Sequence, residues 1–223
     1  MTAEWSPHWL NASGSLAPWH EAIGAEIEAA RSCLSQKAPV PRLDILLQRA
    51  PGNVIPELGM GGYAYHSKLL SLSFDPDNPH FEGALRDGAV RRTVLHEVHH
   101  CLRMAGPGYG RTLGEALVSE GLAGQFVGFL MGSPPELWER AMDEAELDRW
   151  RPTEEELRAT RYDHADWFFG VGGEPPRWLG YTLGYRLAGR WLAAAGEIDW
   201  ETWVNVPAQT VLDAGLNPPL ARP

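Results

Sequence analysis

The stretch TVLHEVHHCLRM, residues 93–104, places three histidines and a glutamate within a segment that is otherwise largely apolar. The uncharged positions have the spacing of a helix that crosses a core: Val94, Leu95, Val98, Cys101 and Leu102. Burial of an ionisable side chain is costly unless the group is paired or binds a metal ion. The chain must therefore fold so that this helix is buried while its ionisable groups have partners.

The same stretch contains the pattern HExxH, from His96 to His100. On a helix, residues four apart share one face, with Cβ atoms about 5–6 Å apart. Two imidazoles so placed can each bind one Zn²⁺ at about 2.0–2.1 Å. Glu97 follows His96 directly and projects beside the metal, which is the position of a general base. His99 points about 100° away from His100, so we expect it to pack or hydrogen-bond.

A catalytic zinc site needs a third protein ligand and one open position. The next predicted helix carries Glu115 and Glu120, which point about 140° apart around its axis, so only one can face the metal. Glu120 lies in the apolar run ALVSEGLA, where a metal would compensate for the cost of burying a carboxylate. Glu115 lies nearer the start of the helix, where the helix dipole favours an acidic residue. Glu120 is therefore the predicted ligand.

Hydrophobic spacing along the rest of the chain predicts one sheet followed by helices. A helix is expected over 18–36, a buried strand over 42–50, and a hairpin or two neighbouring strands from YAYHS and KLLSLSFDP. Further helices are expected over 81–104, from 112 to about 131, from a capping box at 153–156, over 177–196 and near the C-terminal end. This order predicts an α+β fold, with a small N-terminal sheet packed on the HExxH helix.

The length of 223 residues suits a single domain, with an N-terminal α/β part of about 1–105 and a C-terminal helical part of about 106–223. The net charge of -10 argues against nucleic acid or an anionic membrane as the partner. No apolar run reaches the roughly 20 residues that span a bilayer, and we expect no signal peptide. The two cysteines do not make a disulfide framework, so a reduced, cytoplasmic location is predicted.

The HExxH segment and the later stretch SEGLA, residues 119–123, together resemble the gluzincin group of metallopeptidases. More closely, the chain resembles the DUF2268 family of predicted Zn-dependent proteases. The resemblance extends to the aromatic segment WFFG at 167–170 and to GYTLGY at 180–185, and it covers roughly residues 60–216.

This resemblance implies a zincin-like fold and zinc-dependent hydrolysis of peptide bonds, with His96, His100 and Glu120 as the ligands of Zn²⁺. The expected substrate is a peptide or protein, and the oligomeric state is left open. The chain departs from the thermolysin-like pattern at Gly124, where those enzymes carry an aspartate that orients a zinc histidine. The orienting group must come from elsewhere in this chain.

In the expected reaction, the zinc-bound water attacks the substrate carbonyl while Glu97 takes its proton. A further donor is needed for the developing oxyanion. The first candidate is Tyr181. The second is Tyr185, which shares a helix face with Tyr181, and the third is His164. We expect the substrate to add as a strand to a sheet edge, with KLLSLSFDP as the candidate edge strand.

Two alternatives remain open at this stage. The chain could be a catalytically inactive member of the fold that binds peptides or acts as a chaperone-like module. It could also be a zinc hydrolase of non-peptide amides or esters, because the same residues could catalyse that reaction. The presence of Glu97 together with all three predicted ligands favours an enzyme.

Overall fold

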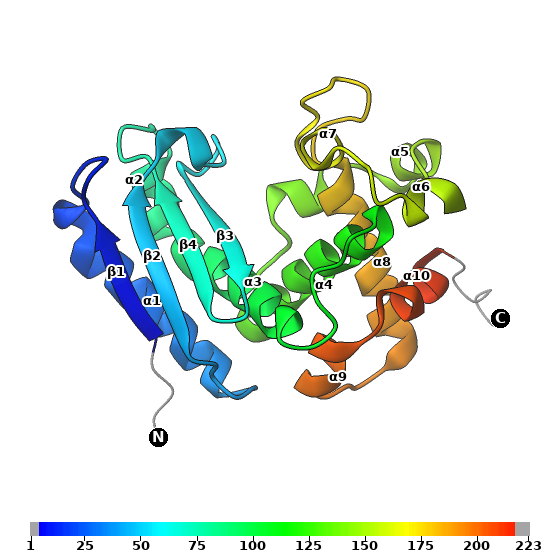
Figure 1. The fold of residues 1–223 in the computed structure, drawn as a ribbon, viewed down its shortest axis with the longest axis horizontal. Helices are drawn as coiled ribbons and strands as arrows, with labels where there is room; N and C mark the ends of the chain where they lie inside the picture. The colour runs from blue at the N-terminus through cyan, green and yellow to red at the C-terminus, as the bar shows by residue number, and fades with distance from the viewer. Residues whose placement is uncertain (1–4, 217–223) are drawn as a thin grey trace. The chain divides into compact units, whose positions relative to one another are not determined.

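The computed structural model describes residues 5–216, and the chain divides into two compact units, residues 1–105 and 106–223. The first unit contains β1 (Trp5–Leu10), η1 (Ala17–Trp19), α1 (His20–Ser35), β2 (Leu43–Arg49), η2 (Pro51–Asn53), β3 (Met60–His66), β4 (Leu69–Phe74), α2 (Phe81–Arg86) and α3 (Ala89–Met104) (Figure 1). Within the described residues of the second unit, the regular elements are all helices. The fold is therefore α+β, with its strands in the N-terminal half.

The four strands form one mixed sheet in the order β1-β2-β4-β3. Strands β1, β2 and β4 run parallel, whereas β3 pairs with β4 in the antiparallel direction. Of the two arrangements that the sequence left open, the structure therefore has the hairpin. The run LLSLSF of β4 is buried along almost its whole length, which is typical of an interior strand. The prediction that KLLSLSFDP forms the sheet edge is therefore wrong, because β4 is paired on both sides and β3 is the outer strand.

Helices α1, α2 and α3 lie behind the sheet in the view of Figure 1. The buried positions of α1 recur at helical spacing and are Ile23, Ile27, Ala30 and Leu34. On the strands, Ile45 pairs with Leu70 and Leu47 with Leu72, and all four side chains are buried. Burial of this apolar face is the main stabilising contribution to the first unit.

The predicted helix over 81–104 is interrupted at Gly88. Helix α2 ends at Arg86, and α3 begins at Ala89 after Gly88 adopts a left-handed conformation with φ 77°. Glycine takes this conformation without the steric cost that a Cβ would add. The break gives α3 a direction independent of α2.

Strand β1 was not predicted from the sequence. Its residues WSPHWL include Pro7, which cannot donate a ladder hydrogen bond and is tolerated in strands mainly at sheet edges. β1 is the outer strand opposite β3, and Trp5 Nε1 donates to the carbonyl of Pro41 at 3.1 Å. Its place in the sheet therefore depends on contacts distant in the sequence.

The second unit is built around α4 (Leu113–Met131) and α8 (Leu179–Ala195). Around them lie η3 (Leu137–Arg140), α5 (Glu144–Arg149), α6 (Glu154–Arg158), α7 (His164–Phe169), α9 (Trp200–Asn205) and α10 (Ala208–Leu216). The backbones of α4 and α8 meet at Gly121 and Gly184, where a Cβ on either glycine would overlap the other helix. This contact lets α4 be buried on most sides, as its apolar sequence predicts.

None of the helices in the described part of the chain has the length and apolar character needed to cross a bilayer. The cytoplasmic location and the joining of both units into a single domain remain predictions from the sequence.

Candidate functional site

Helix α3 carries the two predicted histidine ligands one turn apart. The ring centroids of His96 and His100 are 4.7 Å apart and their planes are nearly perpendicular, at 80°. His100 is buried, whereas His96 is half-buried. His99 is fully buried, with its ring centroid 6.2 Å from that of His100. The helix therefore presents the rings of His96 and His100 together.

Glu97 is buried against the outer strand β3, with 8% of its surface exposed. A Cβ built on Gly62 would lie 2.6 Å from Glu97 Cγ and 2.7 Å from Glu97 Oε1. Atoms at such distances would clash, so only glycine leaves room for this carboxylate beside the strand. Sequence reasoning missed Gly62, although the glycine pair that precedes YAYH marks a place where another group approaches the backbone.

Cys101 lies one turn after Glu97 and remains a neutral thiol. Burial, and next the charge of Glu97, raise the pKa of Cys101 to about 12. Its Sγ lies 3.9 Å from the carbonyl oxygen of Leu69. A thiolate is the form that binds metals or attacks substrates, so Cys101 acts as a core side chain, as predicted.

Glu120 lies in the middle of α4 and is buried, with 8% of its surface exposed. Its Oε1 accepts a hydrogen bond of 2.7 Å from the hydroxyl of Tyr109, which belongs to the loop between α3 and α4. Burial, followed by the charge of Glu120, raises the pKa of Tyr109 well above its usual range. The phenol therefore keeps its proton and serves as a donor. The sequence pattern did not predict this bond.

Glu115 has a different role from Glu120. Its carboxylate accepts hydrogen bonds from the backbone N–H groups of Arg111 at 2.7 Å and Thr112 at 2.9 Å. The Thr112 side chain accepts in turn from Glu115 N, which completes a capping box at the start of α4. The hydrogen bond from Arg111, followed by that from Thr112, lowers the pKa of Glu115. Glu115 thus caps the helix, as its position near the helix start indicated.

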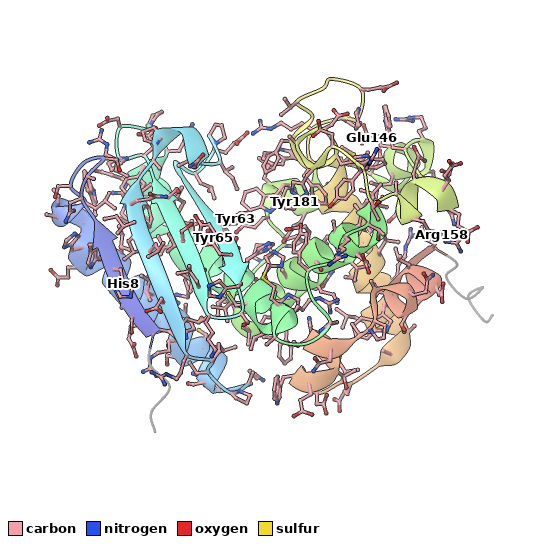
Figure 2. The ribbon with its side chains drawn as sticks, viewed as in Figure 1. His8, Tyr63, Tyr65, Glu146, Arg158 and Tyr181 are labelled. Carbon is pink, nitrogen blue, oxygen red and sulfur yellow. The ribbon has the colours of Figure 1, made fainter. Side chains whose placement is uncertain are left out.

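Two of the candidate oxyanion donors, Tyr181 and His164, belong to an aromatic group in the second unit. The ring of Tyr181, labelled in Figure 2, packs edge-on against Phe168 with a centroid distance of 5.0 Å and lies 5.8 Å from the ring of Trp178. His164 is stacked on Phe168 at 4.3 Å. Of the candidates, Tyr181 is the one whose charge raises the pKa of Tyr109, so it lies in the neighbourhood of the Glu120 partner.

Tyr185 lies one turn further along α8 and belongs to a different neighbourhood. Its ring borders Gly124, and burial, followed by the charge of Glu139, raises its pKa. The carboxylate of Glu139 is buried and occupies the space that a side chain at position 124 would need. Because Gly124 has no side chain, the carboxylate of Glu139 fits beside it.

An imidazole nitrogen from each of His96 and His100 and a carboxylate oxygen of Glu120 make up a group of donors that could hold a metal ion. Two imidazoles and one carboxylate are also a donor set found in catalytic zinc sites. The residues therefore fit a zinc ion.

Comparison with curated proteins and with solved structures gave no match. A family model described as predicted Zn-dependent protease (DUF2268) matches residues 20–213, which include both histidines and Glu120. The match spans most of the chain. The chain therefore belongs to the DUF2268 family of predicted Zn-dependent proteases.

Proposed function

We propose that this chain is a zinc-dependent peptidase with a zincin-like arrangement, in which His96, His100 and Glu120 hold the metal. The observation that carries the proposal is the group of three donors, each supplied by a residue that the sequence pattern singles out. The family description supports the same reaction class. The buried position of Glu120 supports its assignment as a ligand, because an isolated buried carboxylate is costly.

When bound, zinc would supply Lewis acidity, polarising the substrate carbonyl and making a water molecule a stronger nucleophile. The remaining chemistry belongs to the side chains. Glu97 accepts the proton of the attacking water and delivers it to the leaving amine. Its neighbour in sequence is the ligand His96, and its own placement is fixed by contact with Gly62.

We infer that the substrate chain lies along the outer strand β3. An extended peptide can add to the edge of a sheet through main-chain hydrogen bonds. Since Glu97 packs against Gly62 within this strand, a peptide bond held along β3 would pass beside the general base. The neighbouring rings of Tyr63 and Tyr65, whose centroids are 4.9 Å apart, are exposed on the same strand (Figure 2).

Tyr181 is the proposed donor to the developing oxyanion. A phenol hydroxyl can stabilise a tetrahedral intermediate by donating a hydrogen bond to the negative oxygen. Tyr181 is preferred to Tyr185 because it lies close enough to Tyr109, the partner of Glu120, to contribute to the raised pKa of Tyr109, whereas Tyr185 borders Gly124 and Glu139. His164 is the third choice, since its ring is stacked on Phe168.

The test is hydrolysis of a peptide library by the purified protein, measured with zinc, after chelation and after zinc is restored. The proposal predicts cleavage that disappears with the chelator and returns with zinc. Ester and non-peptide amide substrates are tested in parallel with the peptides. Cleavage of these substrates in place of peptides would identify a hydrolase of another class. Failure to bind zinc, or cleavage that persists in Glu97→Gln, would contradict the proposal.

A further inference from the structure

The loop of residues 106–110 carries Tyr109 between two glycines with left-handed backbone conformations. Gly108 has φ 92° and Gly110 has φ 110°, which residues with a Cβ rarely adopt. A side chain at Gly110 would also overlap Glu115. The loop can therefore turn back along α4 only because glycine stands at both positions.

Two hydrogen bonds then hold the returning loop against the helix. Ser119 Oγ donates to the carbonyl of Tyr109 at 2.6 Å, and Glu115 accepts from the N–H of Arg111 at 2.7 Å. Ser119 directly precedes Glu120, so the backbone of Tyr109 is attached at the residue next to the proposed ligand. The phenol hydroxyl of Tyr109 completes the arrangement by donating to Glu120 Oε1 at 2.7 Å.

A glutamate side chain has three rotatable bonds, and ordering it around a metal costs conformational entropy. A hydrogen bond from a side chain that is already fixed removes part of this freedom before the metal arrives. Hydrogen bonds to charged groups are also stronger than those between neutral groups. The Tyr109 hydroxyl thus holds the Glu120 carboxylate in one orientation without replacing it as a ligand.

We propose that Tyr109 is a positioning residue for the metal site, which presets the Glu120 carboxylate for binding zinc. This inference rests on the proposed function only in taking Glu120 as a zinc ligand, and it does not depend on the substrate. Outer-shell partners of metal ligands commonly contribute about 10–100-fold to metal affinity. We expect an effect in this range from the loss of one hydroxyl group.

The chain offers a matched control in Tyr162. The charge of Glu120 contributes to its raised pKa, after burial, so Tyr162 lies in the same neighbourhood. Among the hydrogen bonds of the described residues, however, the tyrosine hydroxyl that donates to Glu120 is that of Tyr109. Tyr109→Phe and Tyr162→Phe therefore delete the same group near the same carboxylate, but only the first removes a bond to it.

The experiment measures the zinc dissociation constant of the full chain by competition with a chromophoric chelator. Tyr109→Phe should raise this constant about 10–100-fold, whereas Tyr162→Phe should leave it within about twofold of the unaltered chain. Cobalt provides a second readout, because its visible absorption reports ligand geometry and should change in Tyr109→Phe alone. Thermal unfolding of the metal-free proteins establishes that each variant folds.

A double-mutant cycle distinguishes direct coupling from general damage. If Tyr109 acts through the carboxylate, Tyr109→Phe should have no further effect on zinc affinity once Glu120 is replaced by alanine. An unchanged zinc dissociation constant in Tyr109→Phe, or an equal loss in the Glu120→Ala background, would overturn the inference while leaving the proposed ligands in place. Absence of zinc binding by the unaltered chain would overturn the proposed function and this inference together.

Discussion

Helices α3 and α4 each bury a glutamate to the same extent, but they surround it differently. Glu97 and Glu120 both expose 8% of their surface. On α3 the carboxylate lies against Gly62, where the opposing strand has no side chain. On α4 the carboxylate accepts a hydrogen bond from Tyr109, whose loop is attached to the same helix. Glu97 is thus placed by close packing on the glycine of a strand, whereas Glu120 is held by a hydrogen bond from a loop attached to its own helix.

The largest effect on catalysis should come from Glu97→Gln. This change removes the proposed base but no ligand, so the turnover number should fall about 10²–10⁴-fold while zinc remains bound. Steady-state peptide hydrolysis together with the zinc content of the purified variant provides the measurement. Full turnover in this variant would exclude Glu97 as the base.

On α4, the main effect of Glu120→Ala should be weaker binding of zinc. Loss of a direct ligand should weaken zinc binding by more than the roughly 10–100-fold that loss of an outer-shell partner costs. The zinc dissociation constant, measured by chelator competition, provides the test. A zinc affinity equal to that of the unaltered chain would show that Glu120 is not a ligand. The proposed difference in role between Glu97 on α3 and Glu120 on α4 would then be wrong.

Gly62→Ala tests whether the close packing of Glu97 on a glycine matters. The added methyl group would lie 2.6 Å from Glu97 Cγ, so the carboxylate must move. Displacement of a reacting group by about 1 Å can cost up to about 100-fold in rate, so turnover should fall while zinc affinity is retained. Gly83→Ala is the control, because a Cβ there meets nothing within 4 Å. Equal activity in both variants would argue against a fixed position for Glu97.

The smallest expected effect belongs to Glu115→Gln, at the start of α4. Its hydrogen bonds lower the pKa of Glu115 below the ordinary 4.5, so its ionised form stabilises the folded state. That contribution is present above about pH 4.5 and is lost as the pH falls through the lower folded value. The variant should lose roughly 0.3–1 kcal/mol of stability at neutral pH and show a weaker acid dependence. Zinc affinity should be unchanged, because the amide oxygen of glutamine can still accept from the N–H of Arg111. Denaturant unfolding at several pH values measures the stability and its acid dependence.

The regular elements were largely predictable because local spacing determines them. The buried face of α1, the β3–β4 hairpin and the apolar α4 all follow from patterns a few residues long. The same is true of the histidine pair, because residues four apart on a helix share a face whatever surrounds them. The glutamates of α4 could also be distinguished, since one lies at the helix start and the other within an apolar run.

What the sequence did not reveal depends on contacts between distant segments. Gly62 matters because Glu97, 35 positions later, approaches its strand, and hydrophobic spacing does not report such a contact. Tyr109 reaches Glu120 only because its loop folds back between Gly108 and Gly110. The outer position of β3 follows from pairing β4 with β2, which lies 20 or more residues away. These features could be recognised only in the folded structure.

A crystal structure of the zinc-soaked protein, with anomalous scattering recorded at the zinc edge, tests whether the three proposed ligands bind one metal ion. We expect a single strong anomalous peak at about 2.0–2.2 Å from one nitrogen of His96, one nitrogen of His100 and one oxygen of Glu120. A peak bound by other residues, or the absence of any peak near these three side chains, would contradict this expectation.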